Sequence, residues 1–412
     1  MEIKGNVLVV GNSGVGKSTL INAVLGEKLA KTSYGIKGTT AELKSYEAED
    51  VPFRLIDTMG FVPGAFKKGK VIKAVKKWGA QAAKEADTQK GAEEKKTDHQ
   101  INVIWFCIDG TSSKLFPSTI KDFLNATSMW KTVPVIVVIT KSYSAPDRRK
   151  NIDMVNEAFA QKKIEKQIKP TEIIPVVAET FVLNAENPAA QAPPEGISEL
   201  IERTNSLMPK GIEEAEQIIF NHILNRKRAF AHSTVGLFTA SGAAVGAVPI
   251  PMPDAPILAG VELGEIKILA QIYGIKKDSN SEELFSAIVK AGTVSVAAKT
   301  AITAVKAIPG VNLAAAVVNA VVAGCIVAAI GEATIYTFEQ IYLGKRSPMD
   351  IDWVKSIVEK RLMDAQFVDK AKEILCNIKL PDGITDKSDK DDILKALAGV
   401  IPNIAKSFQK RE

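Results

Sequence analysis

Residues 6–21, Asn-Val-Leu-Val-Val-Gly-Asn-Ser-Gly-Val-Gly-Lys-Ser-Thr-Leu-Ile, decide the fold of the first half of the chain. The apolar run Val7–Val10 predicts a buried strand, and the apolar spacing after Gly16 predicts a helix. Between them, Gly11–Ser18 matches the pattern G-x-x-x-x-G-K-[ST]. A strand, a glycine-rich turn and a helix start in this order bring backbone N–H groups and a helix dipole to one point. The stretch therefore predicts a phosphate-binding loop in an α/β fold.

The expected ligand contacts of this loop come from its backbone, one ammonium group and one hydroxyl. Lys17 is expected to reach the β- and γ-phosphates, and Ser18 to hold Mg²⁺. The competing interpretation, a chance match in a loop that contains glycines, is disfavoured by the flanking strand and helix patterns. The residues predicted to surround the phosphates are Gly11, Asn12, Ser13, Gly14, Val15, Gly16, Lys17, Ser18 and Thr19.

The composition describes an ordinary folded protein with more than one domain. The chain has 412 residues, of which 46% are hydrophobic and 24% charged, and this length suits two or three buried cores. A net charge of +6 is mild for this length and does not by itself indicate nucleic acid. Cys107, Cys325 and Cys376 form no paired motif, so we expect reduced thiols in a cytoplasmic protein. We expect no signal peptide, because the first strand begins at once.

A second motif follows about 40 residues after Lys17. Strands are expected near Glu42–Tyr46 and Pro52–Ile56, and the second of these runs directly into Asp57-Thr58-Met59-Gly60. This D-x-x-G arrangement suits an Asp57 carboxylate that holds Mg²⁺ through water and a Gly60 N–H that contacts the γ-phosphate.

The polar stretch before these strands supplies a further candidate ligand. Thr40 is the candidate for a threonine that senses both the γ-phosphate and Mg²⁺, and Thr39 is its competitor. The predicted magnesium ligands are Ser18, Thr40 and Asp57, and the predicted catalytic residues are Lys17, Thr40 and Gly60.

Together these residues resemble the G1, G2 and G3 motifs of the translation-factor-related GTPases, nearest the Era-like, septin-like and immunity-related groups. Gly38-Thr39-Thr40 resembles the Era-type switch I. The resemblance implies a P-loop GTPase (G) domain, with a mostly parallel sheet flanked by helices, that binds GTP or GDP with Mg²⁺.

Two departures from the family pattern concern hydrolysis. Phe61 stands where Ras-like proteins carry the glutamine that orients the attacking water, and Gly14 stands where some Era-type relatives use asparagine to bind K⁺. The resemblance therefore implies slow hydrolysis without assistance. A partner, or self-association as a homodimer through the G domain, is expected to supply the missing catalytic group.

The base side of the site is expected at the ends of later strands. Ile101–Asp109 and Pro134–Thr140 are continuous apolar runs typical of central parallel strands, and Ile173–Ala178 predicts the last strand. In the family, the corresponding motif is [NT]-K-x-D, whose lysine packs over the base. Thr140 and Lys141 fit this motif, and Ala178 fits the usual backbone contact to the base.

Tyr143 stands where the family's aspartate accepts two hydrogen bonds from guanine. A tyrosine hydroxyl discriminates far less than a carboxylate matched to two donors. Asp147 is the carboxylate close by in the sequence. Guanine is the base that the resemblance favours, and adenine remains the alternative.

Lysines alternate with apolar residues directly after the D-x-x-G motif. The lysines are Lys67, Lys68, Lys70, Lys73, Lys76 and Lys77, and the apolar residues are Val71, Ile72, Val75 and Trp78. The spacing predicts a basic amphipathic helix. Either its apolar face packs on the domain and its lysines are solvated, or it contacts an effector or an anionic membrane surface. The charge-rich stretch 83–98 predicts a mobile loop.

The alternation of strands and helices stops near Met208-Pro209-Lys210-Gly211. We therefore predict a G domain at 1–208 and an all-α domain at 209–412, with apolar helices at about 229–345 and an amphipathic helical tail. This half resembles the uncharacterised helical domain that follows the G domain in a group of bacterial and fungal GTPases. The matching segments are 254–258, 273–275 and 328–333.

Two segments, Ala229–Ile250 and Gly310–Gly331, contain no Asp, Glu, Lys or Arg and are long enough to span a bilayer. They are rich in Ala, Gly and Val, and Asn319 lies near the middle of the second, which disfavours insertion. One interpretation is a buried helical bundle, and the other is association with a membrane or insertion of a hairpin.

Three functions follow from these patterns. The leading hypothesis is a GTP-binding protein with slow Mg²⁺-dependent hydrolysis that acts as a conformational switch or self-assembling GTPase. The second is a dynamin-like or immunity-related protein whose nucleotide state controls membrane association, which liposome flotation would test. The third is a nucleotide-binding scaffold with little hydrolysis. No nucleic-acid partner is expected.

Overall fold

The computed structural model describes residues 5–26, 31–32, 43–48, 51, 53–58, 73–78, 80, 100–112, 117–161, 164, 169–184, 190–209, 216–248, 254–292, 303, 313–363, 365–378, 381, 384–385 and 388–409. The chain divides into two compact units. The first contains 1–181 and 194–226, and the second contains 182–193 and 227–412. The division at 226/227 lies beyond the boundary at 208/209 that the sequence suggests.

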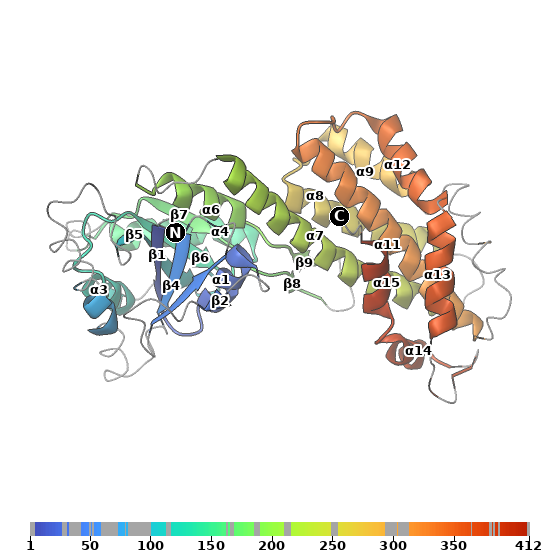
Figure 1. Cartoon of the computed structure of the whole chain (residues 1–412), viewed down its shortest axis with the longest axis horizontal. Helices are drawn as coiled ribbons and strands as arrows, with labels where there is room; N and C mark the ends of the chain where they lie inside the picture. The colour runs from blue at the N-terminus through green and yellow to red at the C-terminus, as the bar shows by residue number, and fades with distance from the viewer. Residues whose placement is uncertain are drawn as a thin grey trace. The chain divides into compact units, whose positions relative to one another are not determined.

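The first unit is built on a seven-stranded sheet with the order β2-β3-β4-β1-β5-β6-β7 (Figure 1). The strands β1, β4, β5, β6 and β7 pair in parallel, whereas β2 and β3 join the edge in antiparallel fashion. The bounds are β1 Gly5–Gly11, β2 Lys31–Thr32, β3 Leu43–Glu47, β4 Phe53–Thr58, β5 Ile101–Asp109, β6 Val135–Thr140 and β7 Glu172–Pro175. The mostly parallel sheet that the sequence predicts is thus confirmed.

The two central apolar runs form strands that are buried along almost their whole length. Every residue of β6 is buried, as is every residue of β5 except Asp109, which is typical of parallel strands covered on both faces. The strand expected at Ile173–Ala178 is shorter than predicted. It leaves the ladder after Pro175, because Val177 instead pairs with Glu195 in an antiparallel bridge.

Helices flank this sheet and complete its core. They are α1 Lys17–Leu25, α3 Pro117–Ala126, α4 Ala145–Phe159, α6 Ile197–Ser206 and the first part of α7. On the sheet, the Phe106 ring stacks on Phe123 of α3 with centroids 4.2 Å apart. The Trp105 indole N–H donates to Thr204 of α6 over 3.0 Å, so its polar edge is satisfied in the core.

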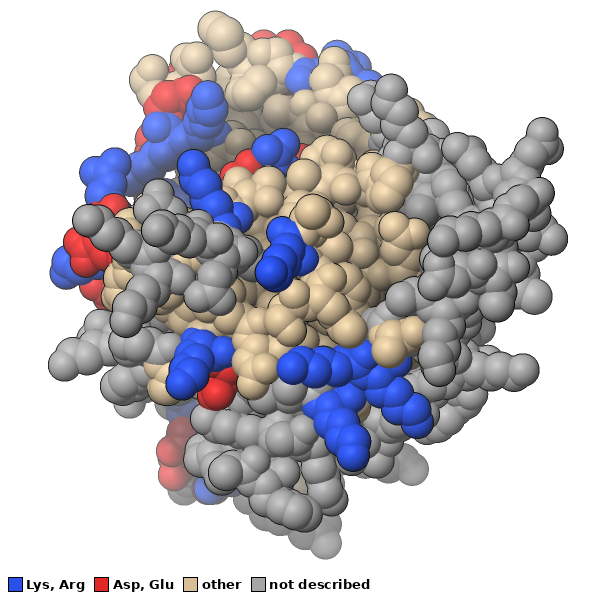
Figure 2. Space-filling view, turned by 90° about the vertical axis from the view of Figure 1, so that its left-hand side faces the viewer, with Lys and Arg blue, Asp and Glu red and all other residues tan. Residues whose placement is uncertain are grey.

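The lysine-rich segment is described only over residues 73–78 and at 80. Residues 73–78 are helical, and Val75 and Trp78 are buried in the core, while Lys73 and Lys77 are exposed. The described part of this helix therefore packs its apolar face on the domain. Figure 2 shows Lys and Arg in separate groups on the face of the molecule that it presents. The predicted mobile loop, 83–98, lies outside the described residues.

Over its described residues, the second unit is helical apart from a two-stranded sheet of β8 Phe181–Val182 and β9 Gln191–Ala192, whose first residue, Phe181, ends a segment of the first unit. One helix, α7 Glu216–Gly246, begins before the apolar segment 229–250 and includes most of it. It has residues in both units. The other helices are α8 Asp254–Tyr273, α9 Ser279–Ala291, α11 Ala315–Tyr342, α12 Ile351–Met363, α13 Ala365–Asn377, α14 Lys390–Leu397 and α15 Ile401–Phe408. The predicted largely helical second half is confirmed.

Helix α11 is the central element of this bundle, and it packs against α8, α12, α13 and α15. Within the described residues, it is the helix that is long and apolar enough to cross a membrane, with a mean hydropathy of 2.0. Of its most apolar window, 83% is buried inside the structure. Its composition is therefore accounted for by its place in the core of the bundle.

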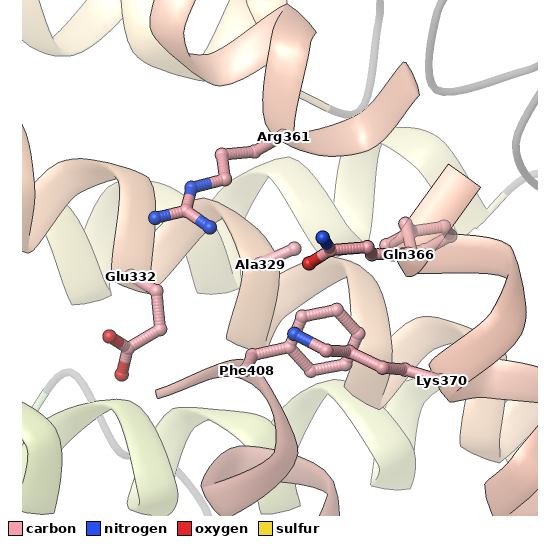
Figure 3. A pocket seen from close by; sticks show the side chains of 7 residues that line it. Ala329, Glu332, Arg361, Gln366, Lys370 and Phe408 are labelled. Atoms are coloured by element: carbon pink, nitrogen blue, oxygen red, sulfur yellow. The ribbon is translucent and has the colours of Figure 1, made fainter. Parts of the chain in front are cut away.

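Polar side chains are also buried along α11. His232 Nδ1 lies 2.8 Å from Glu332 Oε1, and Arg228 forms an ion pair with Glu339. Figure 3 shows a cavity beside this region, with side chains from α11, α12, α13 and α15 around it. Its volume is about 10 Å³, which is the space of one water molecule, so it is too small for a larger ligand.

Candidate nucleotide-binding site

The glycines between β1 and α1 shape the predicted phosphate loop. A Cβ on Gly11 would lie 2.4 Å from Cys107 O, so a larger residue would push β1 away from β5. Gly14 and Gly16 have φ values of 83° and 92°, which lie in the left-handed region that favours glycine. No side chain caps α1 at Gly16. The first N–H groups of this helix therefore face the loop opening, where an anion binds favourably.

Lys17 is held over this loop. Its side chain is buried, and Nζ donates to Gly11 O at 3.4 Å and to Asn12 O at 3.1 Å. Asn12 Nδ2 in turn donates to Thr119 Oγ1 of α3 over 3.3 Å. An ammonium group has three donors, so Lys17 keeps hydrogen-bonding capacity for a phosphate oxygen. Ser13, Gly14 and Ser18 are exposed at the same opening.

Asp57 lies on β4, next to β1 and the phosphate loop. Thr58 Oγ1 donates to Val9 O over 2.9 Å and ties the two strands together. Among the described residues, the buried Asp57 Oδ1 has no hydrogen-bond partner. Burial raises the pKa of Asp57 to about 6, although Lys17 and Lys44 act in the opposite direction.

This orphaned carboxylate oxygen fits a hydrated Mg²⁺. Ser18 and Asp57 would hold the ion from α1 and β4, one as a direct hydroxyl ligand and the other through water. In the part of the chain that the structure describes, no group of three or more His, Cys, Asp or Glu residues suits a metal. A magnesium ion that binds together with a nucleotide takes much of its coordination from phosphate oxygens and water.

Thr140 and Lys141 connect the end of β6 to the phosphate loop. The Thr140 hydroxyl is buried within hydrogen-bond distance of Val15 O and Ile108 O. Lys141 has a φ of 53°, which is uncommon for a side chain with a Cβ. Its Nζ donates to Gly14 O at 2.9 Å, which fixes the lysine stem beside the loop.

The carboxylate of Asp109, at the end of β5, holds the same ammonium group. Lys141 Nζ lies 2.7 Å from Asp109 Oδ2. Desolvation acts to raise the pKa of Asp109, but hydrogen bonds from Lys141 and Thr111 outweigh it and lower the pKa. Lys141 is thus anchored at both the phosphate loop and β5.

Tyr143 and Ala178 lie on two neighbouring loops beyond Lys141. Ser142 N donates to Val176 O over 3.1 Å, so the loops run side by side. The Tyr143 ring stacks on Phe181, with centroids 4.0 Å apart and an angle of 13° between the planes. Asp147 is exposed on the first turn of α4.

The last turn of α1 is held by the first part of α7. His222 Nε2 donates to Val24 O over 2.8 Å, and Arg226 Nε donates to Ala23 O over 2.8 Å. The last carbonyls of a helix have no partner within the helix. These two side chains therefore supply partners at the opposite end of α1 from Gly16.

Of the predicted site residues that the structure describes, Asp57, Thr140 and Lys141 lie near the loop between β1 and α1, whereas Ala178 lies on the loop after β7. Thr39, Thr40, Gly60 and Phe61 lie outside the described residues, so their proposed roles remain predictions. The sequence did not single out the partners that position the site, namely Asp109, Thr119, His222 and Arg226. Asp109 ends a predicted strand, which is a signal in the sequence, whereas the partners on α3 and α7 are separated from the loop by long stretches of chain.

Comparison with known families agrees with this geometry. Residues 6–141 match the family described as 50S ribosome-binding GTPase. This part of the chain is a P-loop GTPase domain. Residues 213–361 of the chain match a domain of unknown function, DUF697, so the G domain is followed by the kind of uncharacterised domain that the sequence suggests. The family is described by GTPase activity, so binding of guanine nucleotide and hydrolysis of GTP are the functions to propose for this domain.

Curated relatives match only part of the G domain. GTPase Der of Neisseria gonorrhoeae is 41% identical over 80 residues, which cover 19% of this chain and 16% of Der. Translocase of chloroplast 34 of Arabidopsis thaliana is 36% identical over 73 residues, which cover 18% of this chain and 23% of the translocase. The chain thus spans less than a quarter of the length of either relative.

Solved structures with similarity to the chain include Era and a septin. Era from Aquifex aeolicus, bound to GDP and aluminium fluoride, has a TM-score of 0.31 and 21% identity, and covers 59% of this chain and 68% of its own. The septin GTPase domain from Chlamydomonas reinhardtii has a TM-score of 0.32 and 17% identity, and covers 53% of this chain and 96% of its own.

Proposed function

We propose that this chain is an Mg²⁺-dependent GTP-binding protein that hydrolyses GTP slowly and acts as a conformational switch. The observation that carries this proposal is a buried ammonium group near a carboxylate that has one buried oxygen without a partner among the described residues. Lys17 lies over the phosphate loop, and Asp57 has an oxygen without a partner among the described residues. Positive charge for phosphates and negative charge for Mg²⁺ are both required by a metal-bound nucleoside triphosphate.

The residues of the chain have separate tasks in this proposal. The N–H groups of the loop and of the start of α1 bind the phosphates, and Lys17 neutralises charge on the β- and γ-phosphates. Ser18 and Asp57 orient the Mg²⁺, whose chemistry is to stabilise the charge that develops on the phosphate oxygens. Thr40 and Gly60 are proposed to respond to the γ-phosphate, and its loss would release the loops that carry them.

Slow hydrolysis is proposed because Phe61 replaces the glutamine that orients water in Ras-like proteins. A side chain of this kind has no hydrogen-bonding group, so a second molecule would have to position the water. We propose that this molecule is a second copy of the G domain. In that case the rate of hydrolysis per molecule rises with protein concentration.

The test is GTP turnover by the full chain, measured from the release of radiolabelled phosphate at low and high protein concentration. In wild type we expect turnover that requires Mg²⁺ and becomes faster per molecule as the concentration rises. Lys17→Ala should reduce turnover by about 100-fold or more, to the level without protein. Lys77→Ala, which removes an exposed lysine of the helix over 73–78, is the matched control and should behave as wild type.

Two results would contradict the proposal. Equal turnover by wild type and Lys17→Ala would show that the phosphate loop does not support hydrolysis. A rate per molecule that is independent of protein concentration would leave the enzyme in place but remove the role of self-association.

A further inference from the structure

The loops after β6 and β7 border the path that a nucleotide base must take. If the phosphates bind at Gly11–Ser18 as proposed, a nucleoside that extends from them toward the end of β6 passes Lys141, whose Nζ donates to Gly14 O. A Cβ on Gly14 would meet nothing within 4 Å, so the loop is open there. Beyond Lys141 lie the stacked rings of Tyr143 and Phe181. A base attached to phosphates in this loop therefore arrives beside this aromatic pair.

Guanine presents two neighbouring donors, N1–H and the 2-amino group, on its Watson–Crick edge. A carboxylate accepts both with its two oxygens, and a charged acceptor forms stronger hydrogen bonds than a neutral one. A site that selects guanine by its donors is therefore expected to bring a carboxylate to this edge. Tyr143 brings none, so the carboxylate must come from another residue near the two loops.

Three of the carboxylates in this region already have a cationic partner. Asp109 is paired with Lys141, and Glu195 lies 2.8 Å from Arg148. Asp147 lies 3.5 Å from Lys150 on the exposed surface of α4. Each of these ion pairs would have to weaken before its carboxylate could bind a base.

Glu179 differs from these three. It directly follows Ala178 and precedes Phe181 by two residues, so it lies on the loop that is bound to the loop of Tyr143. It is exposed, and no hydrogen bond or ion pair joins it to another described residue. Its charge acts on Tyr143: desolvation raises the pKa of the tyrosine, Lys141 lowers it, and Glu179 raises it further.

We propose that Glu179 is the residue that selects guanine, by accepting hydrogen bonds from N1–H and the 2-amino group beside the Tyr143–Phe181 pair. This inference rests on the proposed function, because it assigns a role within the same nucleotide site. In this proposal the residue that selects the base lies on the loop after β7, whereas in the family pattern it lies on the loop after β6. Tyr143 then contributes an aromatic wall instead of an acceptor.

The test compares GDP with IDP, which lacks only the 2-amino group, and with ADP. Their dissociation constants are measured on the full chain with Mg²⁺, by displacement of ribose-labelled GDP. Wild type should bind GDP at least about tenfold more tightly than IDP, and ADP more weakly than either. Glu179→Gln should weaken the binding of both nucleotides, since IDP keeps N1–H, but it should weaken GDP more and so reduce the preference for GDP over IDP to less than about threefold.

Asp147→Asn is the matched control, because it neutralises another carboxylate close to the same loops. It should keep the preference of wild type. The inference is overturned if Glu179→Gln keeps that preference, if Asp147→Asn loses it, or if wild type binds GDP and IDP equally. Equal, tight binding of the two would leave the proposed function intact, whereas no binding of any nucleotide would overturn both.

Discussion

Asp57 has a buried oxygen that lacks a hydrogen-bond partner among the described residues. Burying a carboxylate without such partners favours its protonated form, and the pKa of Asp57 is raised from 3.8 to about 6. The arrangement is unfavourable for the nucleotide-free protein and favourable for a bound cation. A functional group of this kind is expected to cost stability until its ligand arrives.

The first prediction is that Asp57→Asn stabilises the nucleotide-free protein in a pH-dependent way. Because the pKa is higher in the folded state, the proton is bound more tightly there. Wild type therefore loses stability as the pH rises from about 4 to 6, by about 3 kcal/mol in total, and the loss stays constant above pH 6. Asp57→Asn should match wild type near pH 4 and exceed it at pH 8.

Thermal unfolding in EDTA at a series of pH values measures this difference. The same variant should bind GTP with Mg²⁺ more weakly than wild type. A lower unfolding temperature for Asp57→Asn at pH 8 would show that the carboxylate has a stabilising partner in the fold, and would contradict the prediction.

At the scale of elements, the helices α7 and α11 approach closely in the second unit because small residues face each other. A Cβ on Gly242 would lie 2.6 Å from Val327 Cγ2. On the same helix, a Cβ on Gly236 would meet nothing within 4 Å. A methyl group added at Gly242 would therefore clash with the neighbouring helix, whereas one added at Gly236 would meet open space.

The second prediction uses this contrast. Gly242→Ala should lower the free energy of unfolding of the helical unit by about 1–3 kcal/mol, because Val327 or the helices must move. Gly236→Ala should raise it by about 0.5–1 kcal/mol, because alanine favours the helix and meets open space. Denaturant unfolding followed by far-UV circular dichroism measures both. Equal effects of the two substitutions would contradict the role of α7–α11 packing.

The sequence predicted those helices, strands and loops that are marked by a pattern within a short stretch of chain. The predicted range 101–109 coincides with β5, and the pattern at Gly11–Ser18 located the phosphate loop. The full extent of α7 was not predicted, because its second part is rich in Gly and Ala and carries no charged face. Long-range partners such as His222 were missed for another reason: no local pattern links a side chain to a carbonyl about 200 residues away.

The base side of the site was also only partly predictable. The sequence located Lys141 and Ala178 by motif and showed that Tyr143 departs from it. The sequence could not show which carboxylates form ion pairs with lysine or arginine side chains. Ion pairs such as Asp109–Lys141 depend on strands meeting at one edge of the sheet, and this is decided by tertiary structure.

At the scale of the whole molecule, the first unit depends on residues beyond the predicted boundary at 208. His222 and Arg226 bind carbonyls of the last turn of α1, and Ile219 and Ile223 are buried. The third prediction is that a fragment 1–208 is less stable than a fragment 1–230, by on the order of 3 kcal/mol.

Chemical unfolding of the two fragments without nucleotide measures this difference. In the longer fragment, Arg226→Ala should lower stability by about 1–2 kcal/mol, because it leaves the Ala23 carbonyl without its partner. Gln217→Ala, at an exposed position on the same stretch of α7, is the control. Equal stability of the two fragments would contradict the prediction.

The contact between α7 and α1 also bears on the order of events during protein synthesis. The strands and the phosphate loop leave the ribosome before residues 222 and 226. Until these two residues emerge, the carbonyls of Ala23 and Val24 lack the side-chain partners that they have in the folded protein. Once they arrive, the start of α7 is fixed in helical form on a folded surface. Starting a helix is the costly step, and adding residues to one is not. The residues of α7 after 226 therefore extend a helix whose first turns are already formed.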